Sequence, residues 1–157
     1  MMPRRDKGSS ADPLAYAFKL LNYRPRSKRE MIWRLKRKGF DEEAIDETIR
    51  FLEDKGLIDD KLLASELMRS AIERKHLGKK GIEDLLHHRG IGKEEIDEAL
   101  LSHTEATEED AAKRLIEKRL KTLKNYPLET IKRRLIEMLR RRGFSSDVIH
   151  RMINRIG

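Results

Sequence analysis

The chain has 157 residues, of which 41% are charged and 38% hydrophobic, and its formal net charge is +8. This composition is typical of a lean helical protein and makes polyanions, nucleic acid first among them, candidate partners. The lack of cysteine excludes disulfides, thiolate nucleophiles and cysteine-containing zinc sites, and no apolar run approaches the roughly 18 residues of a membrane span. We expect a cytoplasmic protein without membrane association.

Residues 1–11 are basic but lack the apolar segment of a secretory signal, so we expect them to form a disordered tail. Three later segments, 12–23, 60–75 and 107–123, are expected to be helices because each begins with a proline, a capping residue or acidic residues. Asp59 and Asp60 are the predicted caps of the second of these helices, and Thr107 is the predicted start of the third.

Three segments align on a glycine: LKRKGF (35–40), LHHRGI (86–91) and LRRRGF (139–144). Apolar residues recur at the same distances before and after each glycine; they are Met31, Leu35, Phe40, Ile45 and Ile49, then Ile82, Leu86, Ile91, Ile96 and Leu100, then Leu135, Leu139, Phe144, Ile149 and Ile153. Apolar positions four apart define one face of a helix, and the glycine suits a left-handed helix end. A unit that recurs about every 50 residues indicates a repeat protein.

Each unit is therefore expected to contain a helix, a glycine turn and a second helix, with Asp41 and Ser145 as N-caps after two of the turns. With the preceding helix, this gives an all-α fold of three tandem three-helix repeats forming an elongated, curved array. The predicted boundaries are 1–11 for the tail, 12–57 for the first repeat, 58–103 for the second and 104–157 for the third.

The segment RSKREMIWRLKRKGF (26–40) places the only tryptophan within the most basic part of the chain. One interpretation is that the cations satisfy helix dipoles and salt bridges inside the repeat. The other is that they contact phosphates or an acidic protein, and this is the stronger prediction for residues 24–38. The candidate binding residues are Arg24, Arg26, Lys28, Arg29, Trp33, Lys36, Arg37, Lys38, Lys79, Lys80, Lys132, Arg133, Arg140, Arg141 and Arg142.

Trp33 can be placed by helical geometry. If Met31 and Leu35 face inward, Trp33 points to the opposite side of the helix. The equivalent positions of the other repeats hold Asp84 and Glu137, which indicates a solvent-facing position. An exposed indole among cations suits contact with a base or a partner side chain, whereas the alternative is packing against the preceding helix or the tail.

No catalytic, metal or cofactor site is expected. His87 and His88 are adjacent and point about 100° apart, so they do not form the i, i+4 pair that chelates one ion. The sequence contains no phosphate-binding loop, no dinucleotide motif and no nucleophile with a recognisable base.

Residues 16–91 resemble the RecX family, bacterial regulators of the RecA recombinase, through RPRS (24–27), LEDKGLIDD (52–60) and the pattern that ends in RGI (89–91). The third repeat matches the family in its expected helix pattern more than in its sequence motifs. The resemblance implies three tandem three-helix repeats, no catalytic residue, and a protein that binds RecA and its filament on single-stranded DNA. It also implies DNA binding, seating in the filament groove, and inhibition of ATP hydrolysis, strand exchange and co-protease activity.

The predicted function is therefore a monomeric, non-catalytic regulator whose partners are the RecA filament and single-stranded DNA, with duplex DNA left open. One alternative is a stand-alone DNA-binding protein that uses helix-turn-helix-like pairs in the major groove. The other is a passive helical scaffold whose charge serves only solubility.

Overall fold

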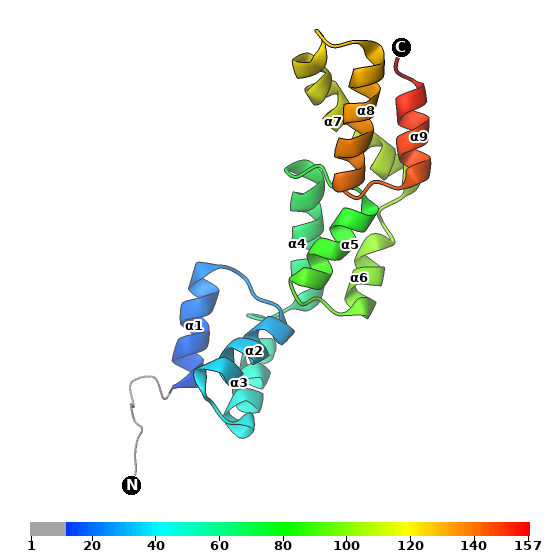
Figure 1. Ribbon diagram of the computed structural model, residues 1–157. Helices are drawn as coiled ribbons and strands as arrows, with labels where there is room; N and C mark the ends of the chain where they lie inside the picture. Colours follow the sequence, from blue (N-terminus) through cyan, green and yellow to red (C-terminus); the bar gives the residue numbers. More distant parts are fainter. Residues whose placement is uncertain (1–11) are drawn as a thin grey trace. The chain divides into compact units, whose positions relative to one another are not determined.

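The computed structural model describes residues 12–157, so the expected tail, 1–11, lies outside the described residues. Within residues 12–157 the chain forms nine helices and no strand, as Figure 1 shows. The helices are α1 (Pro13–Tyr23), α2 (Lys28–Lys38), α3 (Glu42–Asp54), α4 (Asp60–Glu73), α5 (Lys79–His88), α6 (Lys93–Leu100), α7 (Glu105–Leu123), α8 (Leu128–Arg141) and α9 (Ser146–Asn154). The prediction of an all-α chain of three-helix repeats is confirmed.

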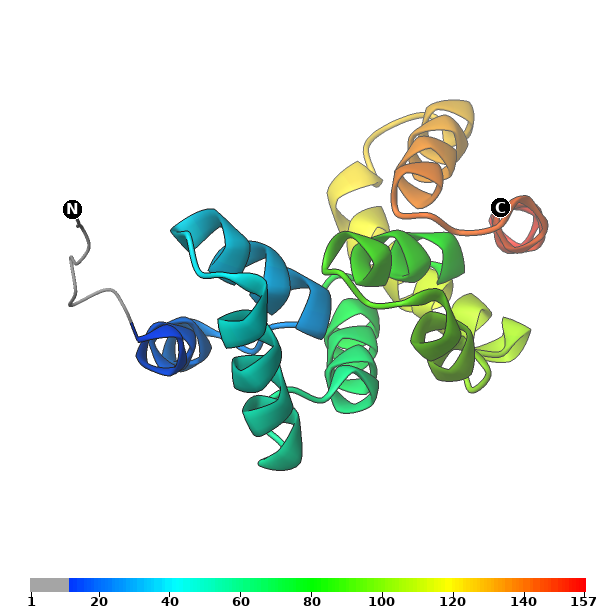
Figure 2. The same cartoon turned by 90° about the horizontal axis from the view of Figure 1, so that it is seen from below.

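The chain divides into two compact units. The first contains the residues up to Leu63 together with Arg89–Gly92, and the second contains Ala64–His88 and Lys93–Gly157. Helices α1, α2 and α3 belong to the first unit, and α5 to α9 with most of α4 belong to the second. Figure 2 shows α4, α5 and α6 beside one another in the second unit. The repeat boundaries predicted above stay a prediction.

Helix α2 illustrates how the local sequence builds each repeat. The Ser27 hydroxyl accepts a hydrogen bond from the Glu30 N–H at 3.0 Å and so caps the first turn. Met31 and Leu35 follow at four-residue spacing and are completely buried in the core of the first unit. Gly39, with φ of 105°, ends the helix in the left-handed conformation that glycine adopts most readily.

The apolar columns of the sequence form the cores. All of the aligned apolar residues are buried except Phe40, which is half-buried and packs against the first core. The glycines of the second and third turns, Gly90 and Gly143, have φ values of 86° and 84°, so all three turns have the predicted left-handed residue. Each fully buried leucine or isoleucine contributes about 1.5 to 3 kcal/mol through removal of its surface from water.

Three predicted helix starts are confirmed and one is wrong. The carboxylates of Asp41 and Asp59 accept from the N–H groups three residues later, at 2.8 and 3.1 Å, and Ser145 does the same at 3.2 Å. The helix predicted to start at Thr107 starts earlier, because Thr104 is the N-cap and accepts from the Thr107 N–H at 3.2 Å. The hydroxyl of Thr104 therefore has the capping role that the sequence pattern assigned to Thr107.

Carboxylates also cap helices that are distant in sequence. In the first unit, Asp60 accepts from the Lys28 N–H at the start of α2, at 3.0 Å. In the second unit, Glu108 is only 4% exposed and accepts from the Lys79 N–H at the start of α5, at 3.0 Å. Lys28 and Lys79 occupy equivalent positions in their repeats. In each case an acidic side chain near the start of a later helix, α4 or α7, stabilises the helix start.

Within the second unit, the turn after α8 packs backbone to backbone against the start of α5. The Gly78 N–H donates to the Arg142 carbonyl at 2.9 Å, and the Lys80 N–H donates to the Gly143 carbonyl at 3.0 Å. A Cβ at Gly81 would lie 2.3 Å from the Arg142 carbonyl oxygen. Only glycine fits these positions, because any side chain would separate the two segments.

Candidate functional site

Some cations of the basic stretch form bonds inside the first repeat. The Glu30 carboxylate lies 2.9 Å from the guanidinium of Arg24, 2.7 Å from that of Arg26 and 3.9 Å from that of Arg34. Arg26 also donates to the Leu20 carbonyl and is only 4% exposed. A buried Arg26 is not available to a partner, so we remove it from the candidate surface and assign it a structural role.

Lys28 forms a further ion pair, 3.3 Å from the Glu53 carboxylate. The interpretation that the cations serve salt bridges within the repeat therefore applies to Lys28, Arg24 and Arg26. Arg34, which was not a candidate residue, also pairs with Glu30.

The remaining cations lie on the opposite, exposed face of α2. Arg29, Lys36 and Arg37 are exposed and, within residues 12–157, form no ion pair. Trp33 lies among them and is 51% exposed, which confirms the prediction that it faces solvent. We define these four residues, Arg29, Trp33, Lys36 and Arg37, as the α2 face.

The indole of the α2 face is flanked by guanidinium groups. The Arg37 guanidinium carbon lies 4.8 Å from the Trp33 ring centroid, and that of Arg34 lies 5.8 Å from it. Arg37 follows Trp33 by one helical turn, whereas Arg34 is its neighbour in sequence. Lys38, at the end of the helix, is also exposed and places its ammonium 5.2 Å from the Tyr16 ring centroid. Cations beside exposed rings are typical of surfaces that bind bases and phosphates.

Helix α8 also carries cations at the equivalent positions. Arg133, Arg140 and Arg141 correspond to Arg29, Lys36 and Arg37 in the glycine alignment; they are exposed and form no ion pair within the described part of the chain. We call these three residues the α8 face. The other two candidates of this region, Lys132 and Arg142, are partly buried. The Arg142 guanidinium donates a hydrogen bond to the Lys75 carbonyl.

The second repeat lacks such a face. Its equivalent cation, Lys80, lies 3.0 Å from the Asp84 carboxylate and 3.6 Å from that of Glu83. The hydrogen bond from Lys80 to Asp84, followed by the charges of both carboxylates, raises the pKa of Lys80. Lys79 is exposed and forms no ion pair within residues 12–157, but it lies one residue before the position equivalent to Arg29. Of the three glycine-aligned helices among the described residues, α2 and α8 therefore carry three unneutralised cations at these positions and α5 does not.

Replacing Trp33 with alanine should separate a binding role from a core role. Because the indole is half exposed, we expect the free energy of unfolding to fall by less than about 1 kcal/mol. Loss of stacking on a base should weaken binding to single-stranded DNA by about 1 to 3 kcal/mol. Thermal melting and fluorescence anisotropy on the same variant measure the two quantities.

Two variants serve as controls for Trp33→Ala. Trp33→Phe keeps a stacking ring and should retain most of the affinity, whereas Met31→Ala, at a fully buried position, should destabilise by about 2 to 5 kcal/mol. A Trp33→Ala variant as unstable as Met31→Ala, with normal affinity, would contradict a binding role for the indole.

Two other kinds of site, a metal site and a membrane-spanning helix, are absent from the described residues. Within residues 12–157 no group of three or more histidine or acidic side chains is arranged to hold a metal ion. No helix in the same range is long and apolar enough to cross a membrane. His87 and His88 are exposed at the end of α5, and His103 is buried, which lowers its pKa.

The chain matches two models of the RecX family: that of the first three-helix domain at residues 14–52 and that of the third at residues 107–153. Regulatory protein RecX of Chlorobium limicola is 34% identical over 148 residues, which cover 94% of this chain and 91% of the relative. The corresponding protein of Mycobacterium sp. (strain KMS) is 33% identical over 138 residues, which cover 85% and 75%. The crystal structure of RecX from Lactobacillus salivarius aligns with a TM-score of 0.80 at 25% identity, over 96% of this chain and 97% of the other. These relatives are named regulatory proteins, and the chain belongs to the RecX family.

Proposed function

We propose that the chain binds the RecA filament on single-stranded DNA and inhibits its ATP hydrolysis, and with it strand exchange and co-protease activity. The observation that carries this proposal is the α2 face, where an exposed indole lies among three cations that no carboxylate neutralises within residues 12–157. Such a surface suits the phosphates and bases of a nucleoprotein and the acidic side chains of a protein partner. Membership of a family of regulators supports an inhibitory role without catalysis.

The repetition of the cations on α8 supports a repetitive target. Two weak sites on one chain gain avidity when the partner offers the same surface at regular intervals, as a filament does. The α8 face has Glu137 where α2 has Trp33, so we assign base or ring stacking to α2 and electrostatic contact to both. The chain would then engage several protomers at once and slow their cycle.

Titration of the chain into RecA from the same organism, on single-stranded DNA, tests the proposal. ATP hydrolysis should fall as the ratio rises toward one chain per RecA protomer, and the chain alone should hydrolyse no ATP. Unchanged hydrolysis at that ratio would overturn the proposal.

A second series with excess single-stranded DNA distinguishes the proposal from a stand-alone DNA-binding protein. A chain that acts only by sequestering bare DNA loses its inhibition when DNA is added, because free strand is then available to RecA. A chain that binds the assembled filament keeps inhibiting. Restoration of full hydrolysis by excess DNA would therefore favour the DNA-binding alternative.

A further inference from the structure

The second unit contains a cationic pocket that joins Arg141 and Arg142 of the basic stretch on α8 to cations of α7 that the sequence analysis did not single out. It has a volume of about 390 Å³ and lies between α7, α8 and the segment that follows α4. This volume falls within the range of small-molecule sites, about 300 to 1,000 Å³. Its polar lining includes Arg74, His76, Lys118, Arg119, Thr122, Arg141 and Arg142, and no acidic residue.

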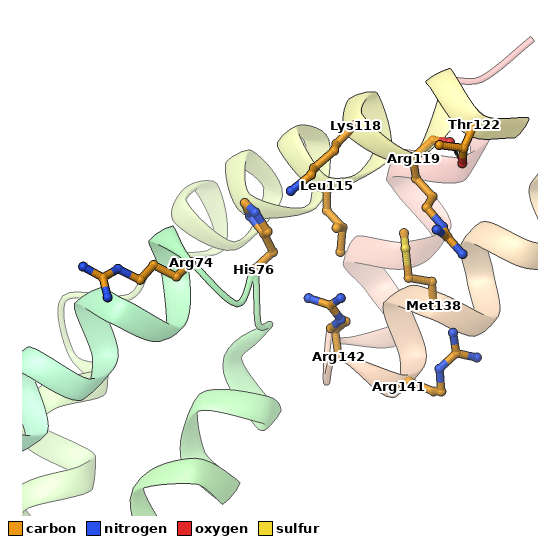
Figure 3. A pocket seen from close by; sticks show the side chains of 9 residues that line it. All are labelled: Arg74, His76, Leu115, Lys118, Arg119, Thr122, Met138, Arg141 and Arg142. Atoms are coloured by element: carbon orange, nitrogen blue, oxygen red, sulfur yellow. Dashed lines mark hydrogen bonds between the residues drawn. The ribbon is translucent and has the colours of Figure 1, made fainter. Parts of the chain in front are cut away.

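Figure 3 shows how these side chains come together from separate elements. Arg119 extends from α7 and Arg141 from the end of α8, with the apolar Leu115 and Met138 between the two helices. Lys118 lies beside His76 at the edge of the pocket, whereas Arg74 points away from the other side chains. The pocket thus has an apolar base and a cationic rim.

No carboxylate among the described residues neutralises the cations of the pocket. Among the described residues, neither Lys118 nor Arg119 nor Arg141 forms an ion pair. Arg142 is held by the Lys75 carbonyl, which accepts from its guanidinium and fixes its position. Since a carbonyl carries no full negative charge, the positive charge of the pocket is not neutralised within residues 12–157.

His76 provides an independent sign of a ligand. Its Nδ1 is buried and has no hydrogen-bond partner within the described part of the chain. The backbone of His76 has a φ of 52°, a conformation that non-glycine residues rarely adopt. Burial lowers the pKa of His76, and the nearby charges of Lys118, Arg142 and Arg114 lower it further. Strained residues with unused polar atoms cluster at binding sites.

We propose that this pocket is a phosphate-binding site, with Arg119, Arg141 and Arg142 as its principal ligands and Lys118 and His76 at its rim. Arginine binds phosphate through paired N–H···O bonds, and several guanidinium groups around one cavity match a multiply charged anion better than a single carboxylate. The phosphate could belong to a small phosphorylated ligand or to a nucleic-acid strand. The site deepens the proposed function by adding a discrete anion pocket to the basic faces, yet it requires neither RecA nor filament binding.

Calorimetric titration of the full chain with pyrophosphate tests the site without RecA or DNA. We expect saturable one-to-one binding that Lys118→Gln with Arg119→Gln, two pocket cations outside both basic faces, weakens by at least about tenfold, since each lost charge-assisted bond contributes on the order of 1.5 to 3 kcal/mol. The matched control is Lys113→Gln with Lys121→Gln, which removes the same charge from exposed positions of α7 outside the pocket. In the wild-type chain, pyrophosphate should also shift the NMR signals of the His76 ring and leave those of the exposed His150 unchanged.

The same variants titrated with a short single-stranded oligonucleotide distinguish the two sources of phosphate. Saturable pyrophosphate binding that the pocket variant loses supports the site and indicates a small phosphorylated ligand. No pyrophosphate binding, together with oligonucleotide binding weakened more by the pocket variant than by the control, supports the site and indicates strand phosphate. Equal behaviour of pocket and control variants in both titrations overturns the proposal, whatever the outcome of the RecA assay.

Discussion

Gly143→Ala should destabilise the second unit by about 2 to 5 kcal/mol, a large part of the stability of a small domain. Gly143 has φ of 84°, where an alanine is strained by about 1 to 2 kcal/mol. Its Cβ would also lie 2.1 Å from the backbone nitrogen of Gly81 and 2.6 Å from its Cα. Because the obstacle is backbone rather than a flexible side chain, the turn and the start of α5 must move apart, which adds about 1 to 3 kcal/mol.

Gly39→Ala is the matched control for this prediction. Gly39 ends the equivalent helix of the first repeat with φ of 105°, but its Cβ would meet no atom within 4 Å. We therefore expect Gly39→Ala to lower the free energy of unfolding only by the backbone strain of an alanine at positive φ, about 1 to 2 kcal/mol. Urea unfolding followed by circular dichroism measures both variants. Equal losses would show that the close approach of Gly143 to Gly81 does not affect stability.

The second large effect is expected from neutralising the α2 face. Replacing Arg29, Lys36 and Arg37 together with glutamine should weaken binding to single-stranded DNA about 100-fold at 0.1 M salt. Each phosphate contact contributes about −0.7 to the slope of log K against log salt, so if about five contacts fall to about two, the slope should change from about −3.5 to about −1.4. Since the three side chains are exposed and form no ion pair within residues 12–157, the melting temperature should stay nearly constant.

The control removes three charges elsewhere. Lys113, Lys121 and Lys124 are exposed on or next to α7, and their replacement with glutamine gives the same net charge as the α2-face variant. Anisotropy titrations at several salt concentrations compare the two. If the control lost as much affinity and slope as the α2-face variant, binding would depend on net charge and not on this surface.

The sequence by itself determined the fold of each repeat. Glycines that recur about every 50 residues, with apolar residues at fixed distances around them, specify helix, turn and helix because helical periodicity and the left-handed glycine are local properties. The exposure of Trp33 followed from the same periodicity, since Met31 and Leu35 define the buried side of α2. The start of α7 was misplaced because Thr104 and Thr107 are both suitable caps, and local sequence does not decide between them.

Only the tertiary structure decided which charges are available. The sequence shows Arg26 and Arg29 as equal members of one basic stretch, but Arg26 folds back on Glu30 and Leu20 whereas Arg29 remains exposed. The cationic pocket was likewise beyond sequence analysis, because Arg119 and Arg141 belong to different helices and line one pocket only where α7 packs beside α8. Helical periodicity fixes the direction of a side chain within its own helix, but pairing and proximity depend on the packing of elements distant in sequence.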